Sequence, residues 1–429
     1  MMTRPSSPMH RLALCAACAG GLSLAAVAPA HADDWASRSA ADFWNGSSAT
    51  LEARQFYFNR EFHHQPAPRP GAVGLAQAFI FQFNSGYTAG PVGLGVDLLG
   101  QAGYRLHGGA GTNIMPYRTD GSPENEYAKL RPTYKAKLGK TTVKYGTFVF
   151  NDPFAISDYT RLLQATYKGW LVESHDLDRL ALIGARLSGN QYANATHYSD
   201  FVLNRYPAYR SDKLVMGGGT YSFPGALGAS ATYRYIWLDG IYRQSFYGLK
   251  GSWHTGAGQS LSGDLRYHVT RPDGGSRAPV DNRAVDAMLT YKLGGAAFGV
   301  GYQHMGGRDP FPYLARSTAY LINFVTINDF ANAHERSWQY RFDYDFARLG
   351  LPGLTFMTRY TAGDHIDRGA GLPAGREWER NTDIGYAFPG GPLKGFSLRW
   401  RNTAIRSSYA AANRFNENRL ILDYVLALK

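Results

Sequence analysis

SWQYRFDYDF, residues 337–346, alternates strictly between two kinds of side chain. Aromatic rings occupy every second position from Trp338 to Phe346, while Arg341, Asp343 and Asp345 stand between them. Successive side chains of a β-strand point to opposite faces of the sheet. The stretch therefore predicts a strand with one aromatic face and one charged face.

The same alternation recurs along a chain of 429 residues that contains 14% aromatic residues and 49 glycines. Segments of about ten alternating residues, separated by Gly, Pro, Asn and Asp, are typical of β-barrels rather than of several soluble domains. Further examples are LTFMTRY at 354–360, TDIGYAF at 382–388, GFSLRWRNT at 395–403 and RLILDYVLAL at 419–428. We therefore expect a single all-β unit.

The aromatic face is best explained by lipid. Inside a bilayer every backbone amide must be paired, so a spanning protein that has no apolar helix must form a closed barrel. Connections such as 223–228 and 388–395 are short, whereas 270–282 and 363–376 are long and polar. Barrels of the bacterial outer membrane have short periplasmic turns and longer outer loops. The sequence predicts an antiparallel transmembrane β-barrel over residues 33–429.

The amino terminus is typical of an export signal. Arg4 and Arg11 form a basic segment before an apolar core at residues 12–28, and Ala30-His31-Ala32 fits a small-x-small cleavage site. We expect residues 1–32 to be removed. Both cysteines lie in that segment, so the mature chain has none and cannot form a disulfide or a cysteine metal site.

The inward-facing positions are rich in arginine and lysine. The formal charge of the chain is +12, and it falls to +10 without Arg4 and Arg11. A narrow basic lumen favours small anions, and the arginine fork suits a carboxylate. Arg341 with Asp343, or Arg399 with Asp383, can instead brace the wall as ion pairs. Alternation with lipid-facing residues leaves no exposed basic patch, so nucleic acid is not an expected partner.

Several long motifs make the mature chain similar to the OprD family of outer-membrane porins, from about Phe43 to the last residues. The motifs are SGYTAGPVGLGVDLLGQAGYRLHGGAG at 85–111, DPFAISDYTRLLQATYKG at 152–169, NDFANAHERSWQYRFDYDFARLGLPGLTFMTRYTAGDHID at 328–367, EWERNTDIGYAF at 377–388, GPLKGFSLRWRNTAIRS at 391–407 and NENRLILDY at 416–424.

The resemblance implies an eighteen-stranded monomeric barrel in the bacterial outer membrane, narrowed by inward-folded loops, that takes up small carboxylate solutes by diffusion. It also implies a ladder of basic residues along one side of the pore. The matching positions are Arg54, Arg60, Arg131, Arg399, Arg401 and Arg419. Arg341 and Arg359 join the expected set because they have inward parity, and not because of the family pattern.

The family's constriction corresponds here to an early loop, residues 152–166, and a later one, residues 307–313. Asp158, Tyr159 and Arg161 are the candidates in the first. Arg308, Asp309 and Tyr313 are those in the second. We expect Asp309 to face the basic ladder across the narrowest point; an ordinary proline-rich outer loop is the alternative.

The choice of solute stays open. The basic excess favours organic or aromatic acids, whereas Asp309 and Asp158 would suit a basic amino acid. A barrel hydrolase, a plugged structural barrel and a trimeric general porin are further alternatives, but the sequence contains no G-x-S-x-G, H-E-x-x-H or nucleotide-binding motif. We therefore expect no catalysis, cofactor or metal. The expected partners are outer-membrane lipid and the machinery that assembles barrels. That machinery reads an apolar or aromatic residue at the end of the chain, and Lys429 departs from this signal.

Overall fold

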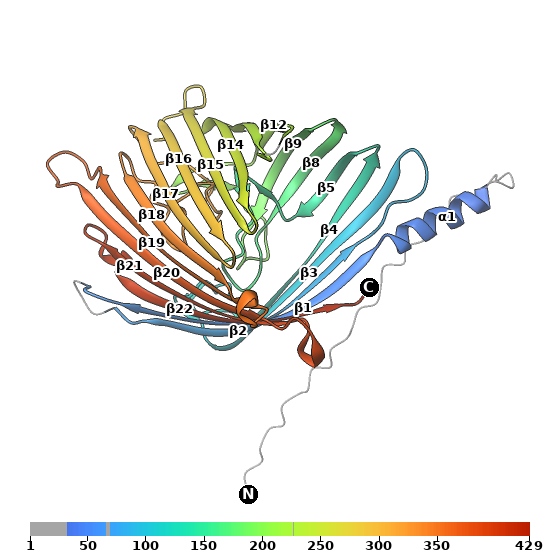
Figure 1. The fold of residues 1–429 in the computed structure, drawn as a ribbon, viewed down its shortest axis with the longest axis horizontal. Coiled ribbons are helices and arrows are strands. Elements are labelled where there is room, and N and C mark those ends of the chain that lie inside the picture. Colours follow the sequence, from blue (N-terminus) through green and yellow to red (C-terminus); the bar gives the residue numbers. More distant parts are fainter. Residues whose placement is uncertain (1–31, 66–68, 226) are drawn as a thin grey trace, which may run out of the picture.

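The computed structural model describes residues 32–65, 69–225 and 227–429. The expected signal segment, residues 1–32, lies outside these ranges except for its last residue. The helix α1 (Ala32–Asn45) precedes the first strand and projects away from the rest of the molecule (Figure 1). Within the described ranges, no helix is long and apolar enough to cross a membrane.

Strands make up most of the described chain, together with three short 3-10 helices. The long strands are β1 (Ser48–Phe62), β2 (Ala72–Asn84), β3 (Gly93–Gly108), β4 (Glu126–Leu138), β5 (Thr141–Phe148), β8 (Thr166–Leu177), β9 (Leu180–Gln191), β12 (Leu214–Ser222), β13 (Ser230–Leu238), β14 (Tyr242–Gly256), β15 (Gln259–Pro272), β16 (Asn282–Leu293), β17 (Ala296–Gly307), β18 (Arg336–Asp345), β19 (Leu354–Ile366), β20 (Gly375–Ala387), β21 (Phe396–Ser407) and β22 (Phe415–Ala427). The short elements are β6 (Asn151–Asp152), β7 (Ala155–Ile156), β10 (Phe201–Leu203), β11 (Tyr206–Ser211), η1 (Phe346–Leu349), η2 (Gly391–Leu393) and η3 (Ala411–Asn413).

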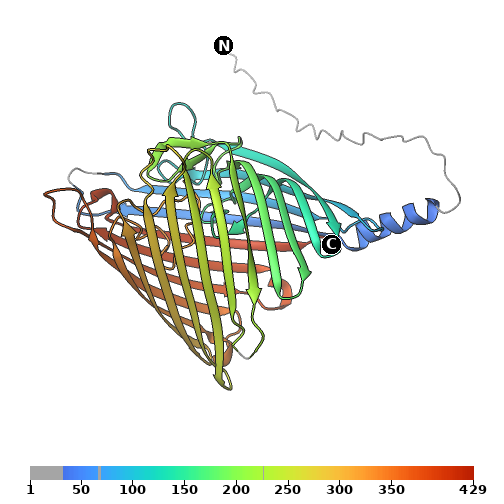
Figure 2. The ribbon, with the colours of Figure 1, turned by 90° about the horizontal axis from the view of Figure 1, so that it is seen from above.

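The long strands form one closed sheet of 18 antiparallel strands, as the sequence led us to expect. Each strand pairs with its neighbours along the chain, and β1 pairs with both β2 and β22, which closes the barrel (Figures 1 and 2). β6 pairs with β7 and β10 with β11 in two small hairpins within the connections. Closure leaves the backbone amides of the wall paired, as a lipid environment requires.

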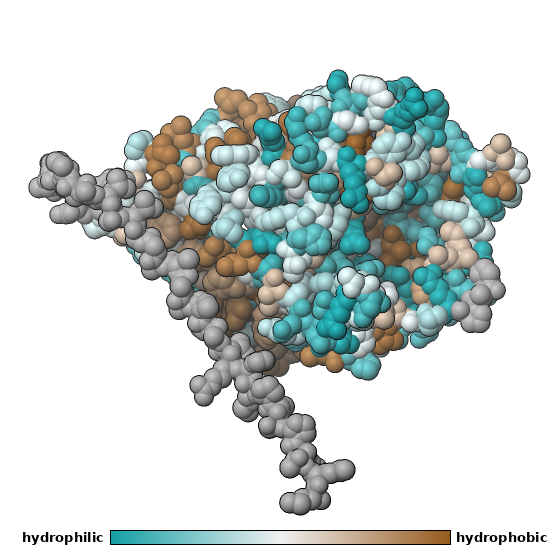
Figure 3. All heavy atoms as spheres, turned by 180° about the vertical axis from the view of Figure 1, so that it is seen from behind, coloured by the Kyte–Doolittle hydropathy of each residue, from teal (hydrophilic) through white to brown (hydrophobic). Residues whose placement is uncertain are grey.

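The opening stretch of the sequence has the predicted two faces. In β18, Trp338 and Tyr340 are 49% and 57% exposed, whereas Ser337 and Gln339 between them are 0% and 1% exposed. The same holds for Leu130 and Tyr134 of β4, which lie on the outer face. Apolar side chains gather in patches on the outer wall, beside strongly hydrophilic groups (Figure 3). Aromatic and aliphatic groups therefore face the lipid.

The connections differ in length between the two ends of the barrel. Turns such as 139–140, 257–258 and 294–295 lie at the end where β1 begins and β22 ends, whereas 109–125, 149–165, 192–213 and 308–335 lie at the other. Outer loops of such barrels are the longer ones. The long-loop end is therefore the extracellular end.

Two of the long loops fold into the lumen. Leu162 and Leu163 of the loop 149–165 are fully buried and pack with Phe56 and Phe58 of β1. In the loop 308–335, Asn323 Nδ2 donates to Ser337 Oγ at 2.8 Å, on the inner face of β18. The expected narrowing by inward-folded loops is thus present.

The outer face should tolerate no charge at the middle of the wall. Leu265 lies near the centre of β15 and is 48% exposed on the lipid side. We expect Leu265→Arg to lower the free energy of unfolding in bilayers by about 2–4 kcal/mol, and Leu265→Val to change it little. Denaturant titration of the refolded barrel in vesicles measures both. An equal effect of the two variants would contradict a lipid-facing position.

Candidate functional site

A cavity of about 490 Å³ lies in the lumen between the wall and the loop 149–165. Three neighbouring strands, β21, β22 and β1, supply its basic side chains. These strands alternate, so one parity of each carries the cations inward. The cavity is lined by Arg54, Arg399, Arg401, Arg419, Tyr159, Thr160, Gly353, Thr355, Gly385, Tyr386, Ala387, Ser397, Leu398, Ile421 and Asp423. Four of the expected ladder residues thus share one space with the early loop.

Arg54 is held by two carboxylates and one ring. Its Nε lies 2.6 Å from Asp423 Oδ1, and its Nη2 lies 2.9 Å from Glu52 Oε1. The guanidinium stacks on Tyr159 with 4.2 Å to the ring centroid, and the Tyr159 hydroxyl donates to Glu52 Oε1 at 3.1 Å. Tyr159 therefore brings the early loop across the lumen to β1.

Arg419 and Arg60 share one buried acid. Arg419 Nε donates to Glu417 Oε1 at 2.6 Å, and Arg60 Nη2 donates to Glu417 Oε2 at 2.5 Å. Arg419 Nη1 also donates to the carbonyl of Thr160 at 3.0 Å. Arg419 therefore fixes the early loop to the wall, and Arg60 supports the acid that holds Arg419. Removing one partner of such a buried group would leave a charge uncompensated.

Arg401 and Arg399 differ in what the neighbouring strands place opposite them. Asp383 lies directly across from Arg401 in the β20–β21 register, and Arg401 Nη2 is 2.8 Å from Asp383 Oδ2. Arg399 is flanked by Gly385 and Ile421, which offer no acceptor side chain. Among the described residues Arg399 has no hydrogen-bond or ion-pair partner, and it is exposed to the cavity.

The remaining ladder candidates lie on the inner wall outside this cavity. Arg341 forms an ion pair with Asp343 at 2.7 Å. Arg359 Nε donates to Asn381 Oδ1 at 2.7 Å, and Arg131 Nη2 donates to the carbonyl of Thr196 at 2.8 Å. Arg359 and Arg131 therefore donate hydrogen bonds to uncharged partners, and the bond from Arg131 also holds the loop 192–213 to the wall.

The other early-loop candidates shape the loop itself. Asp158 Oδ1 accepts from the backbone N–H of Thr160 at 2.8 Å, and the Asp158 carbonyl accepts from Ala165 N at 3.0 Å. Arg161 Nη1 donates to Thr160 Oγ1 at 3.1 Å. Both residues therefore set the turn that presents Tyr159 and Thr160.

The later-loop candidates lie differently from what we expected. Asp309 Oδ2 accepts from Asp281 N at 2.8 Å, and Arg308 Nε lies 3.2 Å from Asp281 Oδ2, with the Arg308 side chain 81% exposed. Tyr313 donates to Asp329 at 2.8 Å. The part of this loop that touches the early loop lies further along, where Ser317 Oγ donates to the Ile156 carbonyl at 2.9 Å. A loop fold of this kind depends on contacts that the local sequence does not specify.

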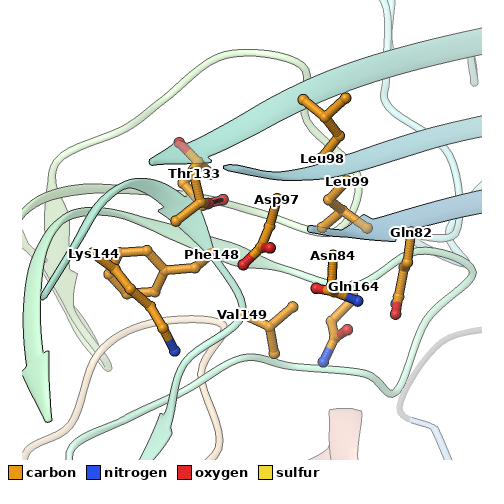
Figure 4. A pocket seen from close by; sticks show the side chains of 11 residues that line it. Gln82, Asn84, Asp97, Leu98, Leu99, Thr133, Lys144, Phe148, Val149 and Gln164 are labelled. Carbon is orange, nitrogen blue, oxygen red and sulfur yellow. Dashed lines mark hydrogen bonds between the residues drawn. The ribbon is translucent and has the colours of Figure 1, made fainter. Parts of the chain in front are cut away.

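A second, mixed-charge recess of about 330 Å³ lies along β2 to β5. Gln82, Asn84, Asp97 and Gln164 direct polar atoms toward it, and Lys144 reaches it from the other side (Figure 4). Asp97 is compensated by Lys135 at 2.6 Å and Lys144 by Glu173 at 3.0 Å. Its charges are therefore paired, unlike Arg399.

The acids Glu52 and Glu417 are site residues that sequence reasoning missed. Each stands two positions before an arginine of the cavity, Arg54 and Arg419, and so shares its face of the strand. The pattern Glu-x-Arg in β1 and β22 was the available signal.

Comparisons with known proteins agree with this geometry. Residues 41–428 match the family model described as outer membrane porin, OprD family. The chain is 34% identical over 396 residues to the porin-like protein GalP of Pseudomonas putida, covering 90% of this chain and 93% of that protein. The chain belongs to the OprD family of outer-membrane porins.

Solved structures of Pseudomonas aeruginosa proteins are also similar. OccK3 (OpdO) matches with a TM-score of 0.82 and 41% identity, covering 92% of this chain and 100% of that one. OpdK, solved with vanillate, matches with a TM-score of 0.84 and 30% identity, covering 90% and 100%. The OprD-family barrel described here is thus a channel of the bacterial outer membrane and not an enzyme.

Proposed function

We propose that this porin gives passive uptake of small carboxylate solutes, organic or aromatic acids, along the arginines of the β21–β22–β1 wall. The observation that carries the proposal is Arg399, an uncompensated guanidinium exposed to a lumen cavity of about 490 Å³. A guanidinium can hold a carboxylate through two parallel hydrogen bonds. Arg401, Arg419 and Arg54 lie around the same cavity and extend the positive field.

The paired arginines have a second role in this proposal. Arg54, Arg401 and Arg419 each touch a carboxylate, so they brace the wall while they still contribute positive potential. A solute bound too tightly would not leave, and partly compensated cations hold an anion less strongly. Arg399 would bind the carboxylate first and its neighbours would pass it on. The vanillate bound to OpdK, an aromatic acid in a similar barrel, supports this class of solute.

A basic amino acid is the second candidate. Glu52 and Asp423 flank Arg54, and Asp423 lines the cavity. These acids can contact a cationic side chain while Arg399 holds the carboxylate. Comparing arginine with benzoate as probes of this site therefore distinguishes the two candidate classes of solute.

The proposal also covers export of the chain and its assembly in the outer membrane. Residues 1–32 would direct export and be removed, and the mature barrel would act as a monomer inserted by the assembly machinery. Lys429 donates to the carbonyl of Trp44 and lies 5.5 Å from that ring. The last residue is therefore held at the barrel's short-turn end.

Removing an acid that pairs with a lumen arginine tests whether the electrostatic potential of the lumen is positive. We expect Asp383→Asn to free Arg401 and to raise the ratio of anion to cation permeability roughly twofold. Reversal potentials in a salt gradient measure this ratio. Asp364→Asn is the matched control, because Asp364 lies outside the lumen on β19. A shift toward cations in the Asp383 variant would contradict the proposal.

A further inference from the structure

Three arginines lie on the lipid-facing side of the wall near its extracellular end. Arg376 and Arg380 share the outward parity of Trp378 in β20, whose inward positions, such as Glu379, are buried. Trp378 packs on the outward ring of Tyr360 with 5.7 Å between centroids. Arg406 lies directly opposite Trp378 on β21. These three, with the amides described next, form what we call the outer arginine patch.

Asparagines rather than acids accompany these arginines. Arg380 Nη2 donates to Asn402 Oδ1 at 3.0 Å, and Arg406 Nη1 donates to Asn416 Oδ1 at 3.1 Å. Asn402 in turn donates to Asn418 Oδ1 at 2.9 Å. Within the described ranges neither Arg380 nor Arg406 forms an ion pair, and both keep unused N–H donors.

Arg380 and Arg406 occupy diagonal positions on neighbouring strands, within reach of one shared anion for side chains of this length. Arg380 lies opposite Ala404, two residues before Arg406, and such diagonal positions are about 7–8 Å apart. Among the described residues of the strands next to the patch, the outward acids are Glu61, opposite Asn416 on β1, and Asp364 of β19, whose carboxylate contacts His365. Neither compensates Arg380 or Arg406. Two cations without an acid partner, at the headgroup level of the wall, are available to bind an anion from outside the protein.

An apolar groove of about 420 Å³ begins beside Arg380. The register places Val300, Tyr340, Tyr360 and Arg380 in one row across β17 to β20. The groove continues to Phe298 and Phe342, which lie further from the extracellular end. Its apolar lining suits a hydrocarbon chain whose charged end lies at the arginines.

The height of the patch on the wall fits the outer leaflet. β20 begins at Gly375 and β21 ends at Ser407, both at the long-loop end, so Arg376 and Arg406 lie one residue from the strand ends. Trp378, between Arg376 and Arg380, is a residue type enriched at the level of lipid headgroups.

We propose that the outer arginine patch binds the phosphorylated headgroup of an outer-leaflet lipid. Arg380 and Arg406 hold the phosphate, Asn402 and Asn416 keep the two side chains extended along the wall, and an acyl chain lies in the groove from Tyr340 to Phe298. The site is independent of solute passage, because these side chains face away from the lumen.

Native mass spectrometry of the full chain in detergent, titrated with bis-phosphorylated lipid A, tests the proposal. We expect Arg380→Gln with Arg406→Gln to weaken lipid binding about tenfold, because two charge-assisted contacts are lost. The matched control is Arg243→Gln with Arg283→Gln, which removes two outward arginines from β14 and β16 and should leave binding unchanged. The difference in gel mobility between unheated and heated samples checks that every variant is folded.

Three results would overturn the proposal. Equal affinity for dephosphorylated lipid A would remove the role of phosphate. Displacement of the lipid by excess inorganic phosphate alone would show that the patch holds a free ion and that the groove has no part. Loss of a dimer or trimer peak in the double variant, with lipid binding unchanged, would assign the patch to contact with a second copy.

Discussion

Glu379→Ala should open the pore and raise single-channel conductance several-fold. The Glu379 side chain is fully buried on the inner face of β20, where its carboxylate accepts the backbone N–H groups of Thr326, Ile327 and Asn328 at 3.1, 3.1 and 2.7 Å. This side chain therefore holds residues 326–328 of the loop 308–335 against the wall, beside the bond from Asn323 to Ser337. Hydrogen bonds to a charged acceptor contribute about 1.5–3 kcal/mol each, so the loss is on the order of 5 kcal/mol.

Planar-bilayer recording of single pores measures the effect. Glu173→Ala is the matched control, because Glu173 also faces inward and pairs with Lys144 but belongs to β8, away from the loop 308–335. The control should keep a conductance close to that of the unchanged protein. If Glu379→Ala is folded and conducts like the control, Glu379 does not hold the loop and the narrow pore has another cause.

Arg399→Ala should weaken interruption of the current by benzoate about tenfold, because one charge-assisted contact to the carboxylate is lost. The fold should be little affected, since Arg399 makes no contact with an acid or with a loop among the described residues. The effect is therefore expected on solute binding rather than on stability.

Arg266→Gln separates this effect from a general loss of lumen charge. Arg266 pairs with Asp264 at 2.7 Å on β15, outside the cavity that holds Arg399. Arg266→Gln removes the same charge from the lumen as Arg399→Ala, so both variants should lower the preference for anions. Only Arg399→Ala should raise the benzoate concentration that interrupts the current. Equal benzoate effects in the two variants would mean that the lumen acts through its overall potential.

The barrel itself could be predicted from the sequence because alternation is local. The aromatic positions of residues 337–346 identified the outer face of β18, and the same parity located Arg399, Arg401 and Arg419 on the inner face. Closure by β1 and β22 follows from the need to pair every amide in lipid.

The partners of each arginine could not be predicted in the same way. Sequence analysis suggested Arg399 with Asp383 as a bracing pair, but the register places Arg401 opposite Asp383 and leaves Arg399 beside Gly385. Pairing across strands depends on register, which a single strand does not reveal. By contrast, Arg341 with Asp343 was foreseen, since both lie on one strand two positions apart.

The inward loops were the least predictable part. Their paths depend on distant contacts such as Ser317 to Ile156 and Tyr159 to Glu52, and no local motif encodes these pairs. Asp309 therefore lies beside Asp281 rather than next to the arginines of the cavity. The outer arginine patch was missed because charges were considered only for the lumen.

The most direct test of the central proposal is the single-channel current of the refolded, unaltered protein in a planar bilayer under a salt gradient, with benzoate and then arginine added on one side. The carboxylate proposal predicts small single-pore steps, a reversal potential that favours anions, and interruption by benzoate at lower concentration than by arginine. Cation preference, or a current that benzoate does not interrupt, would contradict it.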